Sequence, residues 1–287
     1  MKNSLVMMLS PIVLMACSHG PMESTPQDIA AVDTRTELVT KKAEQLQLEP
    51  VLSIDHSRLG ADAGEDLSAS RVSLFSDDKL NAQLLQQNVE SGLDLPFRVL
   101  NYAEDGVVKT RYTSAEFLAR RHGITNKPSL TAFDQTVKQL VEDIPNATPA
   151  STAGLTQGYG ISRIVSDYDF ETTIENIKTS VLSQEGTIWF LTLDFAKRAQ
   201  VQGGTLPKAT LLVFGAPGPG AKAMNEHLSI GLDTFGQKVL VYQTGEQVTV
   251  AYNDIVEMAR LHYDDSAIAH RVVNGMLGKT VSKAVEK

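Results

Sequence analysis

The sequence predicts an α+β protein made of two tandem units, each with the element order β-α-β(4)-α. Two observations lead to this prediction: an internal repeat with an offset of 139 to 140 residues, and the same order of strands and helices in both halves. The composition agrees, because 42% hydrophobic and 21% charged residues are ordinary for a folded globular chain. A chain of 287 residues is long enough to bury a core in each half.

The repeat is visible as matched residues along most of the chain. The first group has an offset of 139 and pairs Ile54-Asp55 with Leu193-Asp194, Gly64 with Gly203, Leu74-Phe75 with Val213-Phe214, and Gly92-Leu93-Asp94 with Gly231-Leu232-Asp233. After one inserted residue the offset is 140, and this group pairs Tyr102 with Tyr242, Tyr112 with Tyr252, Arg120 with Arg260, and His122 with His262. So many matches indicate a tandem duplication of a unit of roughly 90 to 110 residues.

Residues 1–16 have the layout of a secretory signal peptide, with Lys2 before an apolar stretch and Ala16 at the end. The stretch is too short to anchor the chain as a spanning helix. Its end at Cys17 resembles the bacterial lipobox, which implies a cysteine carrying acyl chains such as palmitate, and Ser18 implies sorting to the outer membrane. The alternative is an ordinary signal peptide that leaves Cys17 as a free thiol. We expect a lipid anchor in the bacterial outer membrane, on its periplasmic side.

Residues 17–33 are expected to be a tether, because residues 20–27, which correspond to the first strand of the second unit, contain two prolines and no alternation. The first unit, 34–144, should then begin with a helix and lack a strand at one edge of its sheet, which needs cover. Strands are predicted over 51–54, 71–75 and 97–102, with a turn at Glu104-Asp105-Gly106. An amphipathic helix over 130–144 follows.

Residues 145–158 are rich in Pro, Ala, Ser, Thr and Gly and are predicted to be the linker. The second unit, 159–287, opens with a strand over 159–166 and a helix over 169–183 that Asp169 caps. Further strands are predicted over 187–193, 209–214, 239–242 and 247–252, the last two joined at Thr244-Gly245. Helices are predicted over 196–201, 221–229, 254–262 and, at the C-terminus, 267–285.

Each unit resembles the bacterial and archaeal family known as domain of unknown function 302. The residues that carry the resemblance in the first unit are Asp55-His56, Gly60, Gly64, Leu67, Leu93-Asp94-Leu95-Pro96, Asp105-Gly106 and Tyr112. In the second unit they are Asp194, Ala199, Gly203, Leu206 and Phe214-Gly215-Ala216-Pro217. The second unit departs from the pattern at Phe195 and at Thr234-Phe235. The resemblance implies a curved antiparallel sheet backed by helices, similar to the TATA-binding-protein-like saddle, in domains that often pair, and it implies no established reaction.

One polar set occurs in both units at identical spacing and is the best candidate for a ligand site. Its members are Tyr112, Arg120 and His122 in the first unit, and Tyr252, Arg260 and His262 in the second. Tyr, Arg and His side chains can bind an anionic or aromatic ligand, or a haem. The alternative is local, since Arg and His in the last turn of a helix also stabilise its negative end.

Asp55 and Asp194 are further candidates, because a carboxylate beside an imidazole, as in Asp55-His56, suits a metal or an acid-base pair. The second unit has Phe195 instead of that histidine, which favours a helix cap at both aspartates. The glycine-rich run over 215–222 follows a strand as a phosphate loop would, but its prolines remove amide donors and favour a turn. No motif in the sequence identifies a catalytic residue, a metal site or a cofactor.

These observations predict a non-enzymatic lipoprotein whose two units pack as an intramolecular pseudo-dimer and present a surface to a small ligand or an envelope protein. Nucleic acid is excluded as a partner, because the net charge of −8 gives no basic footprint for phosphate. The alternative is an envelope enzyme or a small-ligand or haem carrier that uses the two Tyr, Arg and His sets.

Overall fold

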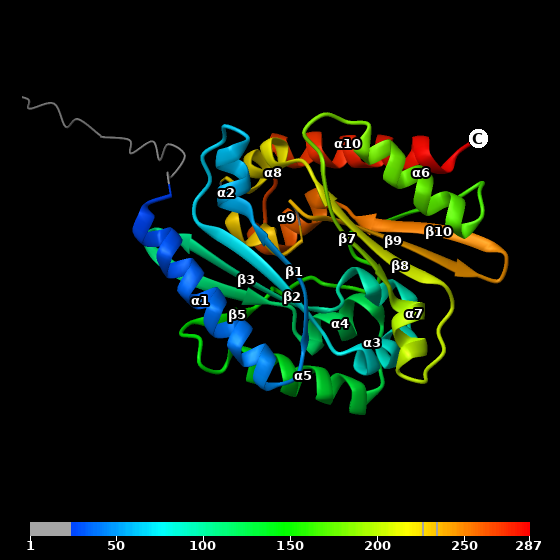
Figure 1. Cartoon of the computed structure of the whole chain (residues 1–287), viewed down its shortest axis with the longest axis horizontal. Coiled ribbons are helices and arrows are strands. Elements are labelled where there is room, and N and C mark those ends of the chain that lie inside the picture. The colour runs from blue at the N-terminus through cyan, green and yellow to red at the C-terminus, as the bar shows by residue number, and fades with distance from the viewer. Residues whose placement is uncertain (1–23, 226, 234) are drawn as a thin grey trace, which may run out of the picture.

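The computed structural model describes residues 24–225, 227–233 and 235–287 (Figure 1). The predicted signal peptide, Cys17 and most of the predicted tether lie outside the described residues. The described chain has the predicted α+β class, with two five-stranded sheets, one in each repeat. No helix in this part of the chain is long and apolar enough to cross a membrane.

The first unit contains β1 to β5 in sequential order within one sheet. Its elements are α1 (Pro26–Gln45), β1 (Glu49–Asp55), α2 (His56–Asp62), β2 (Ser70–Ser76), α3 (Asp78–Leu85), η1 (Val89–Leu93), β3 (Phe97–Glu104), β4 (Val107–Tyr112), α4 (Ala115–His122), α5 (Lys127–Val141) and β5 (Ala147–Pro149). Strands β1 to β4 pair antiparallel, whereas β5 pairs parallel with β4.

Two segments of the first unit differ from the predicted organisation. Helix α1 begins at Pro26, within the predicted tether, because Thr25 caps it and proline is favourable in a first turn. The predicted linker contains β5, which pairs with the edge of β4 that the missing first strand would otherwise leave open. The prediction that this edge needs cover is confirmed, and the cover is a strand that follows the unit rather than one that precedes it.

The second unit repeats this plan with the sheet order β6-β10-β9-β8-β7. Its elements are β6 (Ile161–Val165), α6 (Phe170–Leu182), β7 (Ile188–Asp194), α7 (Phe195–Val201), β8 (Ala209–Gly215), α8 (Pro217–Met224), η2 (Leu228–Leu232), β9 (Gln237–Thr244), β10 (Gln247–Asn253), α9 (Ile255–Tyr263) and α10 (Ile268–Val285). Even an irregularity is repeated: the register shift between Pro50 and Leu52 of β1 recurs between Trp189 and Leu191 of β7.

The glycine-rich run is the end of β8 and the start of α8, four residues earlier than the predicted helix. A side chain at Gly215 would place its Cβ 1.9 Å from the carbonyl oxygen of Phe235, and one at Gly220 would lie 2.7 Å from the Phe235 ring. The glycines therefore allow Phe235 to pack closely against this segment. This packing accounts for glycine at both positions, as a structural turn would, without a bound phosphate.

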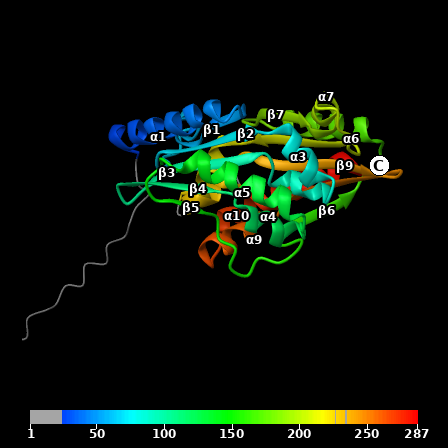
Figure 2. The same ribbon diagram turned by 90° about the horizontal axis from the view of Figure 1, so that it is seen from below.

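The two units pack against each other through equivalent elements. Helix α2 contacts α8 and α3 contacts α7, and these two pairs are exchanged by the repeat. Likewise β3 contacts η2 while β9 contacts η1. In the view of Figure 2, α1 runs along the upper edge of the molecule and α9 lies near the lower edge, with strands of both sheets between them. One hydrophobic core contains residues of both units.

Reciprocal glycines make this contact close. A Cβ at Gly92 would lie 2.9 Å from Leu240 of the second unit, and a Cβ at Gly231 would lie 3.2 Å from Leu100 of the first unit. Both leucines and both glycines are equivalent pairs in the repeat, so each unit offers the other the same surface, as in an isologous interface.

Candidate functional site

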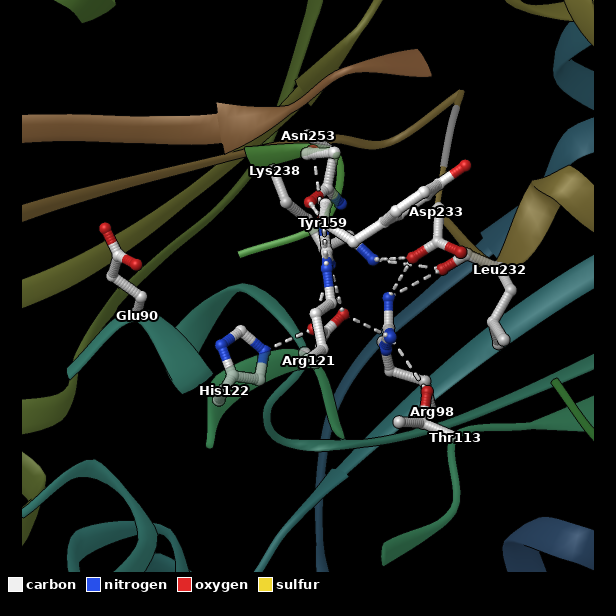
Figure 3. Close-up of polar contacts among 12 residues, drawn as sticks. Glu90, Arg98, Thr113, Arg121, His122, Tyr159, Leu232, Asp233, Lys238 and Asn253 are labelled. Carbon is white, nitrogen blue, oxygen red and sulfur yellow. Dashed lines mark hydrogen bonds and ion pairs between the residues drawn. The ribbon is translucent and has the colours of Figure 1, made fainter. Parts of the chain in front are cut away.

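Seven ionisable side chains are buried together where the two units meet. Figure 3 labels Arg98, Arg121, His122, Asp233 and Lys238 among them. The first unit supplies Asp94 after η1, Arg98 on β3, and Arg121 and His122 on α4; the second supplies Asp233 after η2, Lys238 on β9, and His262 on α9.

Strand alternation aims the basic residues at the neighbouring unit. On β3, Asn101 points to α1, where its Nδ2 donates a hydrogen bond to Thr36. Successive strand residues face opposite sides, so Arg98 and Leu100 face the second unit. On β9, Leu240 lies against Gly92 of the first unit, and Lys238 lines a small cleft with Ile54 and Leu74 of that unit.

Arg98 joins the two units with one guanidinium group. Its Nη1 donates to Oδ1 of Asp233 at 2.6 Å, and its Nη2 donates to Oδ1 of Asp94 at 2.7 Å. The same two nitrogens also donate to the Leu232 carbonyl at 3.1 Å and to the Thr113 hydroxyl at 2.8 Å. The Arg98 side chain has 0% exposure, so solvent does not screen these ion pairs.

Each aspartate also holds the histidine of its own unit. Nε2 of His122 lies 2.6 Å from Oδ2 of Asp94, and Nε2 of His262 lies 3.0 Å from Oδ2 of Asp233. Lys238 completes the second half, since its Nζ donates to Oδ1 of Asp233 at 3.2 Å. The pattern of one aspartate, one strand cation and one helix histidine therefore occurs twice.

Arg121 breaks the symmetry of the cluster, because the second unit has Leu261 at the equivalent position. Arg121 donates to both oxygens of Asp94, at 3.1 and 2.9 Å, and to Oδ1 of Asn253 in the second unit at 2.9 Å. It also donates to the carbonyls of Tyr159, at 2.9 Å, and Gly160, at 3.1 Å. The start of the second unit is thus tied to α4 of the first.

Burial and ion pairing act in opposite directions on the pKa values of the cluster. Burial alone would raise the pKa of Asp94, but Arg121 and Arg98 outweigh it and hold that pKa below its ordinary range. The pKa of Asp233 is lowered in the same way by Arg98 and Lys238 against the effect of burial. Burial lowers the pKa of Lys238 to about 8, with Arg98 acting in the same direction.

The cluster holds more positive than negative charge. Burial lowers the pKa of His122, which favours its neutral form. Arg98, Arg121 and Lys238 supply three cations, which face the two carboxylates of Asp94 and Asp233. Because its seven side chains are at most 4% exposed, the cluster offers no surface to a substrate. Its geometry suits fixing the orientation of the two units.

The predicted Tyr, Arg and His sets do not converge in the structure. His122 and His262 point inward to the aspartates, whereas Arg120 and Arg260 lie on the outer sides of their helices and pair with Glu116 and Glu257. Residues two positions apart on a helix do not share a face, which explains the separation. Tyr112 and Tyr252 are buried in two different hydrophobic clusters. Ligand binding by these sets stays a prediction.

Asp55 and Asp194 cap α2 and α7, as favoured from the sequence. Asp55 Oδ1 accepts from the backbone of Arg58 at 3.0 Å, and Asp194 Oδ1 accepts from the backbone of Lys197 at 2.9 Å. Although burial would raise it, the pKa of Asp55 falls to about 2 because the Arg58 backbone and the Arg71 side chain donate to its carboxylate. Across the described residues, no group of three or more His, Cys, Asp and Glu side chains is arranged to hold a metal ion.

His56 belongs to the contact between units. It is fully buried, its Nδ1 lies 3.0 Å from the Ser70 hydroxyl, and its ring centroid lies 4.8 Å from that of Phe235 in the second unit. Burial lowers its pKa to about 3. At the equivalent place, Phe195 of the second unit lies against Gly92 of the first.

Sequence reasoning did not assign a role to Asp94, Arg98, Arg121, Asp233 or Lys238. Two signals were present. Asp94 and Asp233 match at an offset of 139, and Arg98 and Lys238 are both basic at an offset of 140, each directly before an apolar run of its strand. Arg121 had no such signal, because Leu261 stands at its equivalent position.

With this geometry in place, the family model described as "Domain of unknown function DUF302" matches residues 24–144 and 162–284. The chain belongs to this family. It contains two DUF302 units, as the resemblance implied. A solved structure of an uncharacterized conserved DUF302 protein from Bacillus stearothermophilus is similar to it at 20% identity, covering 44% of this chain and 95% of its own, with a TM-score of 0.36. No curated protein matches the chain.

Proposed function

We propose that this protein is an outer-membrane-anchored, periplasm-facing lipoprotein whose two DUF302 units form an intramolecular pseudo-dimer that serves as a binding or scaffold module. The main support for the pseudo-dimer is that the buried Arg98 forms ion pairs with Asp94 of its own unit and with Asp233 of the other. A charge pair with no solvent access is stabilising only when its geometry is maintained, so it favours one arrangement of the units.

Duplication within one chain supports the same proposal. Linking two surfaces that pair raises their effective concentration, so the contact forms without dependence on protein concentration. The Gly92 and Gly231 contacts are the same on both sides, which is what fusion of a self-pairing domain would produce.

Solution dynamics test the pseudo-dimer. Backbone ¹⁵N relaxation of the protein without its lipid should give one rotational correlation time for both units, together with a scattering profile that fits a single body. An Arg98→Met variant is the comparison, because it removes the bridge and is expected to loosen the units. Separate correlation times for the two units in the wild-type protein would refute the proposal.

The lipid anchor needs its own test, because Cys17 and the preceding residues lie outside the described residues. Cells fed an alkyne fatty acid should label the wild-type protein and not a Cys17→Ala variant. Density-gradient separation of the membranes should place the labelled protein in the outer membrane. A wild-type protein that stays unlabelled and soluble would contradict the anchor.

Native mass spectrometry of the protein purified from its own envelope distinguishes the occupants of the module. A co-purifying protein supports the scaffold role, and a retained small molecule supports the binding role. The alternative of an enzyme or haem carrier gains no support from the geometry, since the Tyr, Arg and His side chains do not meet. A retained haem that is lost in a Tyr252→Phe, His262→Ala variant would reinstate it.

A further inference from the structure

The C-terminal helix α10 is apolar on two sides. Its inner side packs into the second unit through Leu277, Val281 and neighbouring buried residues. Its outer side carries Ile268, Val272 and Met276, which are 75%, 54% and 44% exposed. A helix of a globular protein usually exposes a polar face, so a second apolar row calls for an explanation.

The three exposed residues form a continuous row. They are spaced by four positions, which places them one above the other along the helix. Other large exposed hydrophobic residues among those described come from different elements, for example Leu38 on α1 and Val201 on α7. Met276 also lines a small apolar cleft with Val273 and Phe214, which extends the apolar surface inward.

A basic row lies directly beside the apolar one. Arg271, Lys279 and Lys283 are exposed on α10, and no ion pair within the described residues involves them. The helix has no Asp or Glu between Ile268 and Val285, in a chain whose net charge is −8. An apolar row flanked by unpaired cations complements a membrane surface that bears anionic headgroups.

The position of α10 is compatible with the proposed tether. Ser24, at the start of the described chain, lines a groove with Arg58 and Ala61 of α2. Helix α2 packs against α8, and α8 packs against α10, and Figure 1 shows these helices following one another along the upper side of the molecule. Six residues lie between Cys17 and Ser24, so the seven steps from one to the other span at most about 25 Å.

We propose that the outer face of α10, defined by Ile268, Val272, Met276, Arg271, Lys279 and Lys283, docks onto an anionic lipid bilayer. This inference rests on the proposed lipid anchor, which brings the bilayer within reach. The apolar row inserts at the level of the headgroups, and the basic row contacts lipid phosphates. The helix lies in the plane of the surface and orients the two units relative to the membrane.

A site-specific probe tests the docking. Cys17 is the sole cysteine of the sequence, so a fluorophore on a Val272→Cys variant of the lipidated protein reports one position. In vesicles of phosphatidylethanolamine and phosphatidylglycerol, lipids brominated in their acyl chains should quench this fluorophore. The matched control is a Val201→Cys variant, whose position on α7 is 77% exposed and should stay unquenched. Equal quenching at 272 and 201 would overturn the proposal.

The basic row has a separate readout. Each Lys or Arg near an anionic surface contributes about fivefold to binding, so Lys279→Gln with Lys283→Gln should weaken association by about 25-fold. Vesicles of phosphatidylcholine alone should bind the wild-type protein more weakly still, because Arg271 then also lacks an anionic headgroup to contact. Association that is unchanged by either alteration would refute an anionic lipid as the occupant.

A second tether separates this inference from the lipid anchor. A His-tagged chain beginning at Ser18 keeps every described residue and can be held on nickel-chelating lipids. Quenching at position 272 in this form supports the docking even when Cys17 proves to be unacylated. Protection of position 272 that rises with protein concentration in the absence of vesicles would show that a second copy covers α10, and would overturn the proposal.

Discussion

Replacing Arg98 by Met should destabilise the protein strongly. The substitution keeps an unbranched side chain but removes four donated hydrogen bonds, two of them to the buried carboxylates of Asp94 and Asp233. Loss of one partner from a buried ion pair costs about 3 to 5 kcal/mol, because the remaining charge stays desolvated. The free energy of unfolding, measured by urea titration at pH 7 with Trp189 fluorescence, should fall by about this amount.

The same substitution at an exposed site is the control. Arg120 forms an ion pair with Glu116 in which both side chains are more than half exposed, so Arg120→Met should change the free energy of unfolding by less than about 1 kcal/mol. Equal losses of unfolding free energy for Arg98→Met and Arg120→Met would refute the reasoning that burial makes the Arg98 ion pairs strongly stabilising. A fall with Arg98→Met of under about 1 kcal/mol would refute it as well.

Two further predictions concern the contact between the units. The pKa of His56 is about 3 in the folded protein and 6.5 when unperturbed, so the stability that its neutral form provides is present above pH 6.5 and is lost as the pH falls toward 3. His56→Phe, which copies Phe195, should reduce the dependence of unfolding free energy on pH by about 1.4 kcal/mol per unit between pH 5 and 6, and an unchanged slope in urea titrations would contradict this. Gly231→Ala places a Cβ 2.6 Å from Cε of the fully buried Met224 and 3.1 Å from the His56 ring, and should cost about 1 to 3 kcal/mol. Gly275→Ala, with open space on α10, should stabilise by about 0.5 to 1 kcal/mol. Thermal unfolding of both variants gives the comparison, and equal effects would exclude close packing as the cause.

Local elements of the fold were predictable because their causes lie within a few residues. Asp169 caps α6 through the backbone of Thr172, three positions away, and Asp55 and Asp194 act in the same way. Hydrophobic periodicity located the helices and strands of the second unit to within a few residues. Helix α1 was placed too late in the chain, because prolines near its start were interpreted as part of a tether although Pro26 is in its first turn.

The candidate site was predictable only in part. His122 and His262 were selected because they repeat, and both are in the buried cluster. Their supposed companions Arg120 and Arg260 are on the opposite sides of the same helices. Spacing along a chain identifies neighbours, but which side of a helix is covered depends on what packs against it.

The sequence by itself determined the duplication, the family, the α+β class and the local caps, since each depends on residue identity at short or constant spacing. Only the tertiary structure showed that β5 covers the edge of β4 and that the charges of the two units share one buried cluster. The physical reason is that Arg98 and Asp233 are 135 positions apart. Their energy depends on burial and on the angle at which two surfaces meet, and neither is a property of a segment of sequence.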